Sequence, residues 1–247
     1  MLKIENVETT GWEPAIRGMR NPMNSWDKSD SRWHDIRFTV GKNDIDLMQR
    51  LAKAGTDHRK FMRMITVYVD ILAPLYWWKE FDTYKVGTVA NSCSTMHKIA
   101  AKEFTFDDFS HEKLINSACM KNQEQHIRIS PIQSLATTIE CLNAYRDLYL
   151  QTNDKNYWWQ MIQLLPSSYN QRRTVMLNYE VLANIYKSRR NHKLDEWHTL
   201  CDWIESLPLA EPLITGPIFR EEIKEENKID KIVNHLKDYD GYCGGRR

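Results

Sequence analysis

The feature that most constrains this fold is an alternating, β-branched run that leads directly into an aromatic, amphipathic stretch. Residues 64–71 read MITVYVDI, in which apolar and polar side chains alternate as they do in a strand. Pro74 then suits the first turn of a helix, which we expect to run to about residue 84. A loop rich in Thr, Ser, Asn, Cys and Lys follows, up to Lys98. A polar loop carried by an apolar scaffold is typical of phosphate and cofactor sites.

The remaining pattern predicts an α/β (α+β) fold with a central sheet and surrounding helices. We expect strands over 2–7, 35–40 and, more weakly, 126–130, and a turn-rich loop over 15–33. Apolar spacing predicts helices over the ranges 45–54, 133–151, 154–164, 170–189 and 193–206. After Pro217 a narrow apolar stripe runs along a highly charged segment. We therefore predict one domain over 1–215, followed by an appended amphipathic helix and a frayed tail over 216–247.

Composition excludes several function classes. The chain has 247 residues, a net charge of +1 and five cysteines, none of them in a CxxC pair. This charge gives no global argument for polymeric nucleic acid or a membrane surface. Widely spaced cysteines predict free thiols in a cytoplasmic protein and no structural metal site. No apolar run is long enough to span a bilayer, and the N-terminus lacks the apolar core of a signal peptide.

The loop after the predicted helix holds the densest set of candidate site residues. Gly87 would let backbone N–H groups approach a ligand closely. Cys93 is the one candidate nucleophile, since it lies between two serines and near His97, although an inert thiol is the simpler alternative. Hydroxyl, amide and ammonium groups come from Thr83, Tyr84, Lys85, Thr88, Asn91, Ser92, Ser94, Thr95 and Lys98.

A second segment, LPSSYNQRRTVMLNYEVLANIYKSRR, adds amides and arginines. If 170–189 is one helix, Asn178 and Arg189 are close to three turns apart and share a face. Asn184 then faces elsewhere, by about 120°. Two amides and a terminal Arg would suit a ligand that lies along the helix, whereas capping of neighbouring loops is the plainer alternative.

Together the two segments resemble flavin-dependent thymidylate synthases, the ThyX family. That family shares an apolar lead-in, the motif RHRxxSxNExSxR, a helix with two Asn and an Arg, and a segment ending in QW. Here APLYWWKEF resembles the lead-in and TYK (83–85) stands at the place of RHR. Thr88, Asn91 and Ser94 then match the motif with one inserted residue, and Glu196–Trp197 matches the QW element.

The resemblance implies a role for each matched residue. Flavin contacts fall on Thr83, Tyr84, Lys85, Thr88, Asn91, Asn178 and Asn184. Contacts to the deoxynucleotide fall on Ser92, Ser94 and Arg189, with Arg20 of the N-terminal loop as a further candidate. Ser94 and Cys93 are the candidate catalytic residues. The family further implies FAD as cofactor, NADPH and methylenetetrahydrofolate as co-substrates, dUMP as substrate, and a homotetramer with shared sites.

Departures from the motif leave more than one function open. Thr83 and Lys85 replace two planar guanidinium groups, and Glu180 stands where an Arg is expected. The first hypothesis is an enzyme for reductive C5 methylation of dUMP or a related pyrimidine modification. The second is a non-catalytic relative with a nucleotide-binding, regulatory or inhibitory role. A third is a different nucleotide enzyme that uses Cys93.

Overall fold

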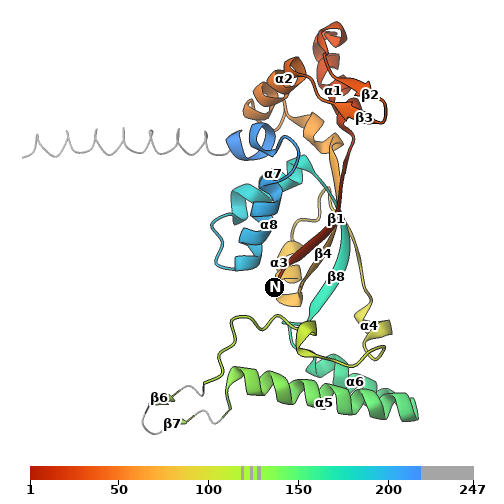
Figure 1. The fold of residues 1–247 in the computed structure, drawn as a ribbon, viewed down its shortest axis with the longest axis vertical. Coiled ribbons are helices and arrows are strands. Elements are labelled where there is room, and N and C mark those ends of the chain that lie inside the picture. The colour runs from red at the N-terminus through yellow and green to blue at the C-terminus, as the bar shows by residue number, and fades with distance from the viewer. Residues whose placement is uncertain (118–119, 123–124, 127–128, 218–247) are drawn as a thin grey trace, which may run out of the picture. The chain divides into compact units, whose positions relative to one another are not determined.

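The structure is a computed structural model, and it describes residues 1–117, 120–122, 125–126 and 129–217. The fold is α+β, as the sequence predicts. Its main sheet has four strands in the order β1-β4-β8-β5 (Figure 1). These strands are β1 (Lys3–Thr10), β4 (Thr66–Pro74), β5 (Val89–Ser92) and β8 (Asn170–Asn178).

The chain divides into two compact units, and each is described by itself. Unit 1 comprises Met1–Glu8 and Tyr68–Met176, and unit 2 comprises Thr9–Val67 and Leu177–Arg247. Strands β1, β4 and β8 therefore each continue from one unit into the other. The expected boundary at 215/216 stays a prediction, because nearly all of the appended helix lies outside the described residues.

Unit 1 is built around two long helices, as their apolar spacing predicts. Helix α5 (Pro131–Thr152) starts at a capping box in which Ser130 and Gln133 satisfy each other's backbone N–H groups. It packs against α6 (Lys155–Leu164), as Figure 1 shows in green and blue-green. Their core consists of Ile99, Phe104, Phe109, Leu135, Ile139, Leu142 and Met161. The unit also contains helix α3 (Leu75–Phe81), the short helix α4 (Thr95–Lys98), the 3-10 turn η4 (Phe106–Asp108) and the small hairpin of β6 (Met120–Asn122) and β7 (Gln125–His126).

Unit 2 gathers helices from both ends of the described chain. Its first half holds α1 (Trp12–Arg20), the 3-10 turns η1 (Asn21–Met23) and η2 (Trp26–Lys28), the hairpin of β2 (Arg32–His34) and β3 (Arg37–Thr39), α2 (Lys42–Lys53) and η3 (Lys60–Met64). Its second half holds α7 (Tyr179–Arg189), α8 (Asp195–Glu205) and the π-helical turn η5 (Glu211–Thr215). Helix α7 packs on both η3 and η5, which ties the two halves together.

Two expectations about these elements are wrong. Most of the segment 15–33, expected as a turn-rich loop, is helix α1 followed by two 3-10 turns and strand β2. The expected helix over 170–189 is strand β8 followed by helix α7. The expected strand over 126–130 is described only at His126, the end of β7, and at its last two residues, which are not in a strand.

Candidate functional site

The polar loop after helix α3 is anchored by aromatic side chains, as the sequence predicts. Trp77, Trp78 and Phe81 are buried, and the two Trp rings meet edge to face with centroids 4.9 Å apart. The indole N–H of Trp78 donates to the carbonyl of Gln171 at 2.8 Å. This bond ties α3 to strand β8, and the loop therefore starts from a fixed position.

Arg173 of β8 holds the turn from which the loop leaves. Its NH1 donates to Asp82 Oδ1 at 2.7 Å and its Nε donates to Gln171 Oε1 at 3.0 Å. The guanidinium carbon lies 4.2 Å from the centre of the Trp78 ring, within cation–π range. The sequence marked Arg173 only as one of several basic residues. No local pattern could reveal a partner 91 positions earlier in the chain.

Asn91 and Ser92 lie on strand β5, which pairs antiparallel with β8 opposite Thr174 and Arg173. Both side chains are exposed. Beyond the strand, the backbone N–H of Cys93 donates to the Arg172 carbonyl at 2.9 Å. The Cys93 carbonyl accepts a hydrogen bond from Gln171 Nε2 at 3.0 Å. The backbone of the motif is thus fixed while its side chains remain accessible.

Cys93 and Ser94 line a cavity of about 460 Å³ in unit 1. Its wall also includes Thr95, Lys98, Lys102, Asp107, Asp108, Tyr169, Asn170, Gln171, Arg172 and Leu72. Ser94 caps the short helix α4 by accepting from the His97 amide at 3.2 Å, and its hydroxyl proton is left to donate elsewhere. Burial, with the charges of Asp108 and Cys93, raises the pKa of Tyr169, so its phenol stays protonated at neutral pH. The cavity brings together the two candidate catalytic residues.

The cations of this cavity differ in how they are paired. Lys102 forms an ion pair with Asp108, and Arg172 pairs with Glu5 at 2.7 Å. The Lys98 ammonium is exposed and has no hydrogen bond or ion pair to any residue that the structure describes. An anion that enters the cavity would therefore meet Lys98 without having to displace a carboxylate.

Of the predicted loop residues Thr83, Tyr84, Lys85 and Thr88, none lines this cavity, and the first two contact the protein itself. The Thr83 hydroxyl donates to the Glu80 carbonyl at 2.7 Å, and the Tyr84 ring lies 6.4 Å from that of Phe81. Lys85 is exposed. Thr88 is half-buried, and its Oγ1 has no hydrogen-bond partner in the described part of the chain, so a ligand atom would satisfy it.

Asn178 is not inside a helix but at its N-cap, because strand β8 ends there. Its Oδ1 accepts from the Val181 amide at 3.0 Å, which satisfies one of the free donors of the first turn. Asn184 is exposed on α7. Arg189 lies in the last turn, with its guanidinium carbon 4.7 Å from the centre of the Trp197 ring. Asn178 therefore caps α7 itself, which differs from the capping of neighbouring loops that the sequence left open.

Glu180 does not present a bare negative charge. Arg59 Nε and NH2 donate to its Oε1 at 3.2 and 3.0 Å, and both side chains are largely buried. An ion pair this enclosed compensates the carboxylate locally. The substitution that would repel a phosphate in the ThyX arrangement is therefore neutralised within unit 2.

Arg20 is buried in a network that holds the N-terminal segment of unit 2. Its Nε donates to Asp44 Oδ1 at 2.6 Å, and its NH1 and NH2 donate to the carbonyls of Ser25 and Lys28 at 3.1 Å each. The side chain is only 4% exposed. All three guanidinium nitrogens therefore serve protein acceptors, and a contact of Arg20 with substrate stays a prediction.

The predicted site residues divide between the units. Those from Thr83 to Ser94 belong to unit 1, whereas Arg20, Asn178, Asn184 and Arg189 belong to unit 2.

Within the described ranges no three His, Cys, Asp or Glu side chains are placed to hold a metal ion. Within the same ranges no helix has the length and apolar character needed to cross a bilayer.

Comparison with known proteins identifies the fold. No family model and no curated protein matches the sequence. Thymidylate Synthase X from Helicobacter pylori, solved with FAD and dUMP, matches with a TM-score of 0.59 and 16% identity over 88% of this chain and 99% of that one. The UMP/dUMP methylase PolB from Streptomyces cacaoi, bound with 5-Br dUMP, matches with a TM-score of 0.56 and 12% identity over 87% of this chain and 95% of that one. The chain therefore has the ThyX fold.

Proposed function

We propose that the chain is a divergent member of the ThyX family that binds a pyrimidine deoxynucleotide, dUMP, and FAD, and carries out reductive C5 methylation or a related pyrimidine modification. The observation that carries this proposal is the fold, which covers 99% of a ThyX chain solved with FAD and dUMP. The motif residues at Thr88, Asn91 and Ser94 support it independently.

The cavity at Cys93 and Ser94 supports binding of a phosphate-bearing nucleotide. Lys98 offers a charge that is unpaired within the described residues, and Ser94 and Tyr169 offer hydroxyl donors. In this proposal Ser92, Ser94 and Arg189 bind the nucleotide. Ser94 orients it by a hydrogen bond, and Cys93, which lines the same cavity, is the candidate nucleophile or proton donor.

The flavin positions fit the cofactor in part. Lys85 supplies one cation where the family motif has more, and the unpaired Thr88 hydroxyl and the exposed Asn184 amide supply polar contacts. With Asn91 and Asn178, these residues would hold FAD, which supplies the redox chemistry when bound. NADPH and methylenetetrahydrofolate as co-substrates, a homotetramer and a cytoplasmic location belong to the same proposal.

A second candidate is a nucleotide-binding relative without flavin chemistry. Thr83 donates to its own helix and Tyr84 packs on Phe81, so two of the three residues at the RHR position have partners within the protein. Such a protein would keep the nucleotide pocket and act in regulation or inhibition. Fold alone does not separate the two candidates.

A visible absorption spectrum of the purified full-length protein, with and without added FAD, separates them. The enzyme proposal expects near-stoichiometric flavin whose bleaching by NADPH is faster with dUMP. A colourless protein that binds dUMP in calorimetry would support the second candidate. Absence of both flavin and dUMP binding would overturn both.

Two lysines of the same cavity provide a matched test of the nucleotide site. Lys98→Gln should weaken dUMP binding by about tenfold or more, because a charge-assisted contact is lost. Lys102→Gln should change the affinity much less, since Lys102 is already paired with Asp108. Equal effects, or none, would mean that the phosphate binds elsewhere.

A further inference from the structure

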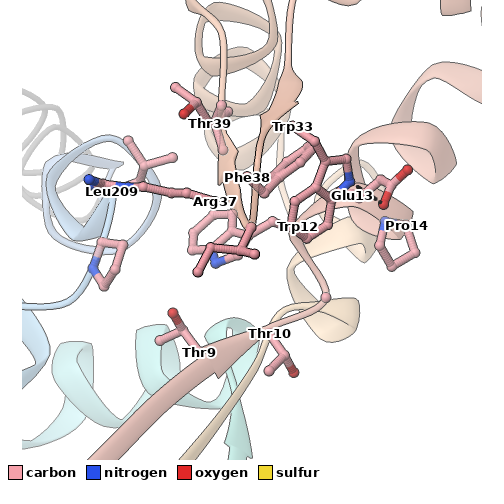
Figure 2. A pocket seen from close by; sticks show the side chains of 14 residues that line it. Thr9, Thr10, Trp12, Glu13, Pro14, Trp33, Arg37, Phe38, Thr39 and Leu209 are labelled. Carbon is pink, nitrogen blue, oxygen red and sulfur yellow. Dashed lines mark hydrogen bonds between the residues drawn. The ribbon is translucent and has the colours of Figure 1, made fainter.

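A second cavity, of about 740 Å³, lies entirely within unit 2 (Figure 2). The end of strand β1, the start of helix α1, strand β3 and the segment at Leu209 form its wall. None of the residues proposed above for FAD or dUMP lines it. Its volume is in the usual range for small-molecule sites.

The cavity wall is rich in aromatic rings that are not fully buried in the hydrophobic core. Trp33 is 56% exposed, and its ring centroid lies 5.3 Å from that of Phe38. Trp12, half-buried at the start of α1, meets Tyr179 edge to face at 5.2 Å, which fixes its plane. Figure 2 shows Trp12, Trp33 and Phe38 close together, with Leu209 across the pocket from them. Exposed rings held in this way offer stacking surfaces for a flat ligand.

Two charged side chains give the aromatic surface polarity. Glu13 accepts from the Trp33 indole N–H through Oε2 at 3.1 Å, which holds the indole and leaves Oε1 for a ligand N–H. Arg37 is exposed, and its guanidinium has no hydrogen bond or ion pair to any other residue in the described part of unit 2. Arg37 therefore offers a free fork of donors at the cavity wall.

The backbone around this cavity is held in uncommon conformations. Leu209 has a positive φ of 55°, which is costly for a residue with a branched side chain. Gly11 has a φ of 86°, and a Cβ there would lie 2.1 Å from the Met64 carbonyl oxygen. Gly11 adopts its conformation without strain, whereas strain such as that at Leu209 is often kept where a site requires it.

We infer that this cavity binds a flat heteroaromatic ring that carries an anionic substituent. The ring stacks on Trp33, with Trp12 and Phe38 beside it, an N–H of the ring or of its amino substituent donates to Glu13 Oε1, and the anion pairs with Arg37. Mononucleotides belong to this class of ligand. The residues that would bind the ligand here are separate from those proposed to contact FAD and dUMP.

Adenosine monophosphate (AMP) is a suitable probe, because it combines a flat ring, N–H donors and a phosphate. Calorimetry with the full-length protein should show AMP binding at millimolar concentration or below, and binding at least about tenfold weaker for adenosine and for ribose 5-phosphate. Saturating dUMP should leave AMP binding in place, which separates this site from the proposed substrate site.

Variants on the same hairpin make the test specific. Arg37→Gln and Trp33→Ala should each weaken AMP binding by about tenfold or more. Arg32→Gln and Trp26→Ala are matched controls, since both residues are exposed, lie near the same hairpin and do not line this cavity. No AMP binding, or binding that Arg37→Gln and Trp33→Ala leave unchanged, would overturn the inference.

Discussion

Arg173 and Trp78 are joined at one point of unit 1, with the guanidinium carbon 4.2 Å from the ring centre. The same guanidinium donates to Asp82, the residue directly after helix α3. One side chain therefore connects strand β8, the aromatic anchor and the first turn of the motif loop.

Arg173→Lys should loosen this connection. Lysine keeps the charge but loses the planar fork, so we expect the free energy of unfolding to fall by about 1–2 kcal/mol. Urea denaturation measures the loss, and faster amide exchange over residues 83–92 locates it. Arg172→Lys is the control, because Arg172 is 42% exposed and pairs at the surface, where about 0–1 kcal/mol is expected. Equal losses in the two variants would show that Arg173 has no special role.

Asp44 should make unit 2 sensitive to acid. Burial alone would raise its pKa, but hydrogen bonds from Ser31, Ser29 and Arg20, with the Arg20 charge, lower the pKa below 3.8. A carboxylate with a lowered folded-state pKa stabilises the protein above the unfolded value, and this stabilisation is lost as the pH falls through the folded-state pKa. The free energy of unfolding should therefore fall steeply below about pH 3.8.

Asp44→Asn tests this assignment. At neutral pH the variant should be less stable by about 3 kcal/mol, because Arg20 is left buried without a counter-charge. Its stability should depend less on pH in the acid range. Asp46→Asn, on the exposed side of the same helix, should change stability by less than about 0.5 kcal/mol. An acid profile that Asp44→Asn leaves unaltered would assign the effect to other carboxylates.

Two cysteines should differ sharply in reactivity. Cys93 is exposed beside its cavity, whereas Cys201 is buried. Burial, followed by the charges of Asp202 and Glu205, raises the pKa of Cys201 to about 12. Because only the thiolate reacts, Cys201 should resist alkylation at pH 8 while Cys93 is modified. Iodoacetamide labelling with peptide mapping by mass spectrometry measures both sites, and Cys93→Ser removes the fast one. Comparable rates in the native protein would contradict the burial of Cys201.

Two glycines with positive φ separate backbone strain from collision. Gly11→Ala should lower the free energy of unfolding by about 3 kcal/mol or more, for two reasons. The new Cβ would collide with the Met64 carbonyl, and alanine is disfavoured at the positive φ of this position. Gly55 has a φ of 103°, but a Cβ added there would have no other atom within 4 Å. For Gly55→Ala we therefore expect only the cost of the backbone conformation, about 1–2 kcal/mol. Thermal unfolding of the two variants checks the order, and a larger loss at Gly55 would reverse the explanation.

The sequence predicts elements best where the periodic pattern is strong and local. Helices α5 and α6 follow from apolar spacing and from the Ser130 cap, and strand β4 follows from β-branched alternation. The expected helix over 170–189 is wrong in its first half, because the apolar run of α7 gives no sign that the helix begins only after NQRRTVML. Asn178 carried the correct signal, since an Asn before a periodic run is an N-cap.

Helix α1 was missed for a different reason. Its buried face consists of Ala15, Ile16 and the charged Arg20. Pro14, Gly18 and the Asn and Pro that follow favour a turn-rich loop in the sequence. Arg20 can be buried only because Asp44 lies opposite, and the sequence gives no sign of that long-range pair.

The candidate site was predicted in part. The loop residues Cys93 and Ser94 share a cavity, as their closeness in sequence suggests. The sequence marks Lys98 as a loop donor, but which lysine of the described cavity is paired with a carboxylate depends on where the acidic residues fold. Gln171 and Arg173 are not predicted as anchors, because in a helix Arg173 could not pair with strand β5 and Gln171 could not reach the Cys93 carbonyl.

The passage of strands β1, β4 and β8 through both units has a consequence for how the protein could be divided. The boundaries fall after Glu8, Val67 and Met176, each in the interior of a strand rather than in a linker. Cutting at any one of them would break a ladder of backbone hydrogen bonds and expose new strand ends. Neither unit is thus a segment that could be excised, expressed alone or exchanged between proteins by recombination at a single point.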